Sequence, residues 1–189
     1  AAVDAVQGSG TIELTSSIAL SDQVTIDSGK TIILDMNGET LSIGFSDSSK
    51  NLIVNNGTLT ITGDGTFDAT EATSYKGFIN NYGTLTVENG TFQIADKAMT
   101  VHLRNQDGGK AVINGGTFSG GATIVRSFEG SNTTITGGSF TNSVYPAVDV
   151  NGETLITGGI FTNTSCSRCD SQNWGYTVRS GVDNDPDAK

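Results

Sequence analysis

Large apolar residues recur along this chain at a nearly constant interval, each at the end of a short phrase that begins with glycine. The phrases are Gly65-Thr66-Phe67, Gly90-Thr91-Phe92, Gly116-Thr117-Phe118, Gly138-Ser139-Phe140 and Gly159-Ile160-Phe161. Their phenylalanines are 25, 26, 22 and 21 residues apart, and Leu41 and Leu20 extend the series towards the N-terminus. Such a period indicates a repeat architecture, in which each unit buries its apolar face only against its neighbours. We predict that Leu41 and the five phenylalanines form one internal ladder.

Each repeat contains three short stretches of strand-forming residues, separated by turns that contain Asn and Gly. Alternate residues within a stretch are apolar, as at Leu59 and Ile61, and Thr58 and Thr60 occupy the positions between them. This period of two predicts strands with one buried and one solvated face. Three strands and their turns fill the length of one coil of a parallel β-helix. We therefore predict an all-β solenoid of about seven coils; a β-sandwich fits less well, because the same order of strands returns in every unit.

The turns themselves repeat as Asn followed by Gly, for example in Asn55-Asn56-Gly57 and Asn81-Tyr82-Gly83. Both residue types tolerate a positive φ, and we expect that to be the reason for their recurrence.

One β-helix domain is expected over residues 1–180, followed by an acidic linker over 181–189. Residues 1–10 begin with an Ala-rich stretch that we expect to form a capping helix, because the open end of a β-helix exposes unpaired strand edges. Residues 162–180 contain Trp174 and Tyr176 and are expected to close the other end. Because the chain opens with Ala1 rather than Met, we expect it to be a processed or excised segment of a larger protein.

Composition narrows the choice of partners. The 189 residues carry 20 acidic and 10 basic side chains, a formal net charge of −10. Such a chain does not neutralise phosphates, so we expect neither nucleic acid nor an anionic membrane surface as a partner. The sequence contains no apolar run near the ~20 residues that span a bilayer, so membrane insertion is not expected.

Residues 27–41 read DSGKTIILDMNGETL, and GTLTI and GGTF phrases follow along the chain. This pattern resembles the right-handed β-helix modules of the pectate-lyase-like superfamily found in surface and adhesin-like proteins of Gram-positive bacteria. The resemblance covers nearly the whole chain and implies an extracellular module attached to the cell surface, with an undefined ligand. It supplies no catalytic motif, and the pair Cys166 and Cys169 departs from the family's Cys-poor pattern.

Polar residues of neighbouring repeats share the first strand of each unit. If Leu103, Val125 and Val148 point inward, alternation turns four side chains outward together. These four are His102, Arg104, Arg126 and Asp149. Such a row is suited to holding a sugar or an acidic glycan through hydrogen bonds and a guanidinium fork, although an ordinary solvated face with routine charge pairing is the alternative. Tyr82 and Tyr145, near turns, are candidates for stacking on sugar rings.

The remaining candidate chemistry is sparse. A glycosidase needs two facing carboxylates about 5–9 Å apart, whereas the row contains only Asp149. Cys166-Ser167-Arg168-Cys169 lacks the two further ligands of a zinc site, so we expect a local disulfide, with free thiols as the alternative. Asp183-Asn184-Asp185-Pro186-Asp187 has Ala188 where a calcium loop requires Gly. Neither a metal nor a cofactor is expected, and an ice-binding face is disfavoured because Ala111-Val112 interrupts the rank of threonines.

These observations favour a non-catalytic, extracellular β-helix module of a bacterial cell-surface protein. Its expected role is adhesion, through binding of a glycan or host ligand, or service as a rigid spacer between neighbouring domains of a larger protein. We expect it to be a monomer. The alternative is a carbohydrate-active enzyme, a polysaccharide lyase or glycoside hydrolase, and that alternative rests on fold analogy alone.

Overall fold

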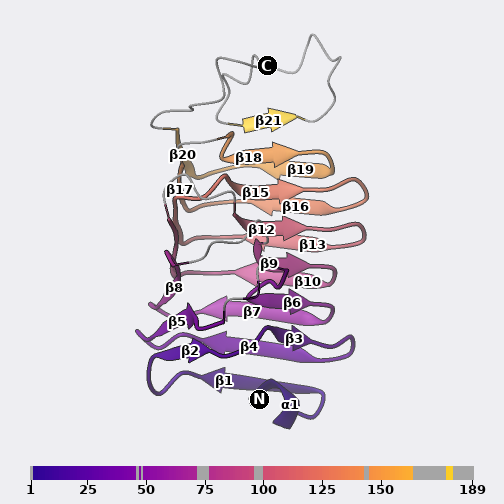
Figure 1. Ribbon diagram of the computed structural model, residues 1–189. Coiled ribbons are helices and arrows are strands. Elements are labelled where there is room, and N and C mark those ends of the chain that lie inside the picture. The colour runs from indigo at the N-terminus through magenta and orange to yellow at the C-terminus, as the bar shows by residue number, and fades with distance from the viewer. Residues whose placement is uncertain are drawn as a thin grey trace.

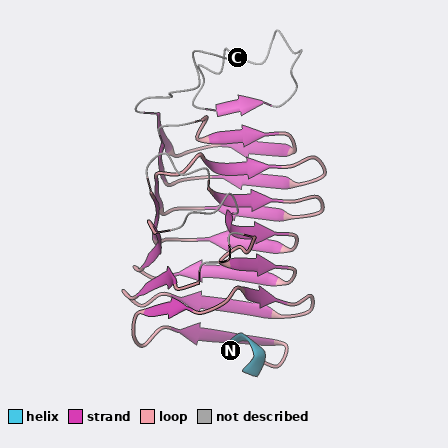
Figure 2. Cartoon of the chain, in the orientation of Figure 1, coloured by secondary structure: helices cyan, strands magenta, loops and turns pink. Residues whose placement is uncertain are grey.

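The computed structural model describes residues 2–45, 47, 49–71, 77–95, 100–142, 145–163 and 178–180. Within them the chain winds as a parallel β-helix, and each coil supplies one strand to each of three parallel sheets (Figure 1). The stack rises from the helix α1 (Ala2–Ala5) at the N-terminal end to β21 at the other, and helix is almost absent from the described chain (Figure 2). The predicted fold class is confirmed.

Each sheet of the described chain has seven strands. Sheet A consists of β1 (Ser9–Glu13), β4 (Thr31–Asp35), β7 (Thr58–Thr62), β10 (Thr84–Val87), β13 (Lys110–Ile113), β16 (Asn132–Ile135) and β19 (Glu153–Ile156). Sheet B consists of β2 (Ile18–Leu20), β5 (Thr40–Ile43), β8 (Thr66–Ala69), β11 (Thr91–Ile94), β14 (Thr117–Ser119), β17 (Ser139–Asn142) and β20 (Ile160–Asn163). Sheet C consists of β3 (Val24–Ile26), β6 (Ile53–Asn55), β9 (Gly77–Asn81), β12 (Val101–Asn105), β15 (Thr123–Ser127), β18 (Val148–Val150) and β21 (Val178–Ser180).

The recurring phenylalanines form a continuous stack inside sheet B. Ring centroids are 4.6 Å apart between Phe67 and Phe92, 4.5 Å between Phe92 and Phe118, and 5.0 Å between Phe118 and Phe140. Phe161 continues the stack 4.7 Å beyond Phe140. The planes of adjacent rings lie within 10° of parallel, because parallel strands repeat each side chain in register. The predicted aromatic ladder is confirmed.

Leucines were expected to continue this ladder in the first coils. Leu41 does so, since it pairs in register with Phe67. Leu20 does not: Ile18 pairs with Leu41, and Leu20 pairs with Ile43. The expectation for Leu20 was wrong because backbone pairing in the first coil places the ladder position two residues earlier.

A second internal ladder is polar and runs along the ends of the sheet C strands. Asn55 Nδ2 donates to Asn81 Oδ1 at 2.7 Å, and Asn81 Nδ2 donates to Asn105 Oδ1 at 2.8 Å. All three residues are fully buried. None of the three has a positive φ, which among the described non-glycine residues is found at Asn37. Buried hydrogen bonding between coils, rather than a positive φ, therefore explains these three Asn residues, and the expectation for them was wrong. It holds at other turns, where Asn37, Gly38 and Gly108 have a positive φ.

The predicted N-terminal cap contains the short helix α1, whose Val3 side chain is buried against the core. Lys30 Nζ donates to the carbonyl of Val3 at 2.6 Å and so fastens the helix to the second coil. At the other end, β21 pairs with β18, whereas Trp174, Tyr176 and the acidic tail lie outside the described residues. In the described part of the chain, no helix is long and apolar enough to cross a membrane.

Candidate ligand-binding face of sheet C

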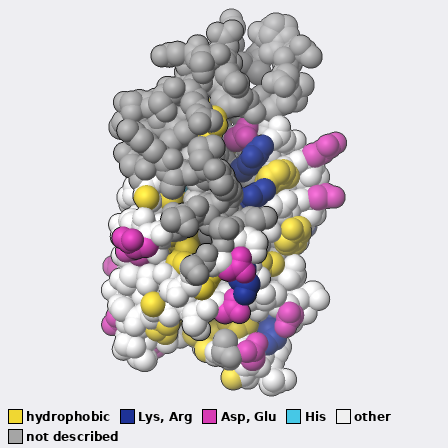
Figure 3. Space-filling model, in the orientation of Figure 1, with side chains coloured by type: hydrophobic (Ala, Val, Ile, Leu, Met, Phe, Trp, Pro, Cys, Tyr) yellow, Lys and Arg dark blue, Asp and Glu magenta, His cyan; other side chains and the backbone are white. Residues whose placement is uncertain are grey.

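Coil stacking brings polar residues from successive sheet C strands into one column. Backbone register aligns Asn80 with Arg104, Arg104 with Arg126, and Arg126 with Asp149, which is 8% exposed; Arg179 is next in register. A second column follows two residues later along the chain. Together they form a cluster that we call the arginine–aromatic patch: Asn80, Tyr82, Arg104, Gln106, Arg126, Phe128 and Asp149. Figure 3 shows basic side chains grouped with hydrophobic and acidic ones on one face of the molecule.

The two arginines of the patch share one aromatic ring. The guanidinium carbon of Arg104 lies 5.3 Å from the centroid of Phe128, and that of Arg126 lies 5.1 Å from it. Both distances are within the range of cation–π attraction. Phe128 therefore contacts the guanidinium groups of two arginines from neighbouring strands. In a chain of net charge −10, the patch is a local concentration of positive charge.

The two guanidinium groups differ in their partners. Arg126 Nε lies 3.3 Å from Asp149 Oδ2, an ion pair without hydrogen-bond geometry. Arg104 forms no ion pair with a described residue, and its buried Nε has no hydrogen-bond partner among them. Burial, with Arg126 nearby, lowers the pKa of Arg104, although Tyr82 partly opposes the shift. Arg104 is thus the less neutralised cation of the pair.

The N-terminal side of the patch is neutral and ordered by side-chain hydrogen bonds. Asn80 Nδ2 donates to the hydroxyl of Tyr82 at 3.3 Å, and Gln106 Nε2 donates to Asn80 Oδ1 at 2.5 Å. Tyr82 nevertheless remains 48% exposed. These contacts orient the Tyr82 ring while leaving much of its surface open to a ligand.

His102 does not belong to this face. It was expected to point outward with Arg104, but it is 1% exposed and packs near Phe78 and Phe118, with centroid distances of 5.6 and 5.9 Å. Its Nε2 lies 3.3 Å from the carbonyl oxygen of Gly120. Burial lowers the pKa of His102 to about 4, so the ring is neutral at pH 7 and Nε2 acts as the donor.

The reason for this error is a break in strand alternation where the sheet C strands begin. In the following coil, Ile124 N and Val125 N both donate to the carbonyl of Ala147 at 3.0 Å, the doubled pairing of a β-bulge. Ile124 and Val125 are consequently both buried. His102 and Leu103 occupy the equivalent positions and are likewise both buried.

Tyr145 also lies apart from the patch. It precedes β18, and its backbone N donates to the carbonyl of Ala122, so it sits where the sheet C strands begin, whereas Tyr82 lies where they end. Its own carbonyl accepts from Asn142 Nδ2 and Asn163 Nδ2. Of the six ligand-binding residues proposed from sequence, the structure brings together Tyr82, Arg104, Arg126 and Asp149.

Phe128 and Gln106 were missed in the sequence, although a signal for them was present. Each lies two residues after an arginine of the column, where the period of two returns to the same face. Tyr82 has the same relation to Asn80.

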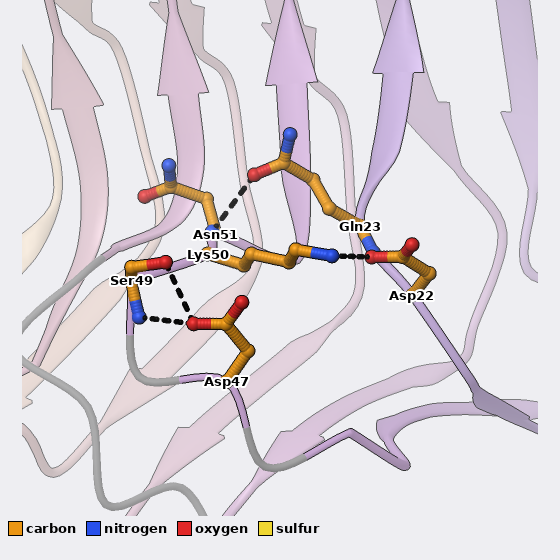
Figure 4. Close-up of polar contacts among 6 residues, drawn as sticks. All are labelled: Asp22, Gln23, Asp47, Ser49, Lys50 and Asn51. Atoms are coloured by element: carbon orange, nitrogen blue, oxygen red, sulfur yellow. Dashed lines mark hydrogen bonds and ion pairs between the residues drawn. The ribbon is translucent and has the colours of Figure 1, made fainter.

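Two other polar regions have ordinary structural explanations. The segment before β6 is tied to the β2–β3 corner: Lys50 Nζ reaches Asp22 Oδ1 at 2.6 Å, and Asn51 N donates to Gln23 Oε1 at 3.0 Å (Figure 4). Asp47 in the same corner accepts bonds from its neighbour Ser49 (Figure 4).

The other region is an open hollow of about 340 Å³ over sheet B, beside Thr66, Thr91 and Thr117. The one carboxylate that lines it, Asp64, accepts a hydrogen bond from Asn89. The hollow contains neither a cation nor an aromatic side chain. The described residues contain no group of three or more His, Cys, Asp or Glu placed to hold a metal ion, and Cys166 and Cys169 lie outside them. The patch is therefore the face with the clearest means of recognising a ligand.

Comparison with protein-family models, curated proteins and solved structures found no match to this chain.

Proposed function

We propose that this β-helix is a non-catalytic, extracellular binding module of a bacterial cell-surface protein, and that the arginine–aromatic patch is its ligand-binding face. The observation that carries the proposal is the pair of arginines over Phe128, of which Arg104 has no ion-pair partner among the described residues. Such a group gains most from an incoming hydrogen-bond acceptor. The continuous internal ladders also suit the module to act as a rigid spacer between neighbouring domains.

The proposal is for binding rather than turnover, because the patch offers little acid–base chemistry. Asp149 is its one carboxylate and is ion-paired with Arg126. A glycosidase mechanism requires a second carboxylate facing the first. No feature of the patch favours the enzyme alternative.

A glycan-array screen with wild-type protein and an Arg104→Gln/Arg126→Gln double variant tests this proposal. We expect weak, salt-sensitive binding that the double variant loses, because an open face desolvates little of a ligand. Lys110→Gln is a control for loss of positive charge outside the patch, since Lys110 lies in β13 of sheet A. Equal binding by the double variant would exclude the patch as the ligand face, and release of reducing sugar or an unsaturated product would refute the non-catalytic role.

A further inference from the structure

The positive charge of the patch that no described carboxylate neutralises is that of Arg104. Asp149 compensates Arg126, while Arg104 stands between Arg126 on one side and the neutral Asn80 on the other. Arg104 is half-buried, its buried Nε has no hydrogen-bond partner among the described residues, and this burial lowers its pKa, yet no described carboxylate pairs with it. A single carboxylate from a ligand supplies the two parallel acceptors that such a group matches.

The surroundings disfavour a second negative charge on the ligand. Along the column, the position beyond Arg126 is Asp149, which is 8% exposed and ion-paired with Arg126, and Arg179 follows it in backbone register. The position beyond Asn80 is the apolar Val54. A polyanion would find one uncompensated cation, Arg104, among the described side chains of the patch, and its other charges would meet repulsion from a protein whose net charge is −10. The charge pattern therefore selects an isolated anionic group over a run of them.

The exposed aromatic ring of the patch, that of Tyr82, lies near Arg104. Tyr82 follows by two residues the position that pairs with Arg104 on the neighbouring strand. Strand spacing and rise per residue put the Cα atoms of Tyr82 and Arg104 about 8 Å apart. The hydrogen bond from Asn80 holds the Tyr82 ring in place, and 48% of the residue remains exposed.

We propose that the patch recognises a glycan with one carboxylated sugar, whose carboxylate binds Arg104 while the adjoining neutral sugar packs against Tyr82. This inference rests on the proposed function and adds the ligand class and the division of roles. Arg126 is a positioning residue here. It is ion-paired with Asp149 and packs on the ring of Phe128, and it contributes less than Arg104 to direct contact with the ligand.

The probe is a sialylated trisaccharide, sialyllactose, with lactose and the methyl ester of the same trisaccharide as controls that lack the charge. Titrations are followed by the ¹H–¹⁵N signals of the arginine Nε–H groups in the full chain. The Arg104 signal is expected to shift with sialyllactose and to stay in place with lactose and the ester. Because these arms use the wild-type protein, the result does not depend on the folding of a variant.

Variants then assign the roles. Arg104→Gln should weaken binding of sialyllactose at least tenfold, Arg104→Lys several-fold because the charge stays and the fork is lost, and Tyr82→Ala about fivefold. Lys110→Gln should bind as the wild type does. A heparin-derived hexasaccharide, as the polyanion, should bind less tightly than sialyllactose.

The outcomes separate the ligand class from the proposed function. If the methyl ester or lactose shifts the Arg104 signal as strongly, or the polyanion binds more tightly, the single-carboxylate assignment is wrong while the patch remains a binding face. If no glycan of the array moves any signal of the patch, this inference and the proposed function are both overturned.

Discussion

The buried histidine makes the stability of this protein depend on pH in a way that can be calculated. His102 is the one histidine of the chain and is 1% exposed, with its Nε2 on the carbonyl of Gly120 and its Nδ1 without a hydrogen-bond partner among the described residues. Removal of the ring from water lowers its pKa from 6.5 to about 4. The imidazolium form is therefore disfavoured in the folded state and ordinary in the unfolded state.

The sign of the effect follows from proton binding. Between pH 6.5 and about 4 the unfolded chain binds a proton at His102 that the folded protein does not. Stability from this group is fully present above pH 6.5 and falls as the pH drops towards 4. A difference of two and a half pKa units, at about 1.36 kcal/mol per unit, corresponds to a loss of about 3 kcal/mol across that window.

Denaturant unfolding at pH 7 and pH 4.5 measures this loss, with His102→Leu as the control. Leu52 occupies the equivalent buried position two coils earlier, so the variant replaces the titrating group by a side chain that this internal position already holds in another coil. Carboxylates titrate in both proteins, and the difference between the two losses isolates the histidine. We expect the wild type to lose about 2.5 kcal/mol more than the variant by pH 4.5.

Two results would refute this reasoning. Equal losses in both proteins would mean that His102 has the same pKa folded and unfolded. The ring signals in ¹H NMR give a direct check because the chain has a single histidine. A midpoint near 6.5 in the folded protein would show that the ring is solvated.

Three further changes test the internal ladders and the C-terminal pair. Phe118→Ala should reduce the free energy of unfolding by about 3–5 kcal/mol, because it empties one position of a closed aromatic stack, and wild-type thermal stability in this variant would reject the register. Asn81→Ala should cost about 2–4 kcal/mol, since it strands buried partners on both neighbouring coils, whereas the exposed Asn56→Ala should be nearly neutral; equal effects would reject the polar ladder. Cys166 and Cys169, outside the described residues, stay predicted as a disulfide, so both should escape alkylation in non-reducing mass spectrometry, and full labelling would disprove the bond.

The repeat could be predicted from sequence because the strongest signals in the chain come from the fold itself. A phenylalanine every 21 to 26 residues, at the end of a period-two stretch, is incompatible with most architectures. The sequence shows where the Asn residues of the polar ladder recur, but it does not show why they are Asn. Propensity suggests a turn residue at Asn81, and only the stacked coils reveal that its amide bridges to Asn55 and Asn105.

The candidate site was predictable only where strand alternation holds. Arg104 and Arg126 are each the next-to-last residue of their strands, where alternation is regular, and both are half-exposed between buried neighbours as period two requires. His102 lies two residues before Arg104, at the start of the strand, where two successive residues, His102 and Leu103, are both buried. Alternation within one strand cannot detect this break, because a bulge changes the local period without changing the residue types around it.

Alignment of the sequence of one coil with that of the next would have detected this break in alternation at His102. The position equivalent to His102 is apolar in the four nearest coils, as Leu52, Phe78, Ile124 and Ala147, and Gln23 occupies it in the first coil. The same alignment places Phe128 beside Gln106 and Tyr82, and so joins the aromatic residues to the arginines. In a parallel solenoid, residues that meet at a site are separated by one coil length rather than by a local motif, since hydrogen-bond register connects the coils. A binding face in such a protein is therefore encoded down the columns, and a search along the strands recovers only the part of it that a single coil contains.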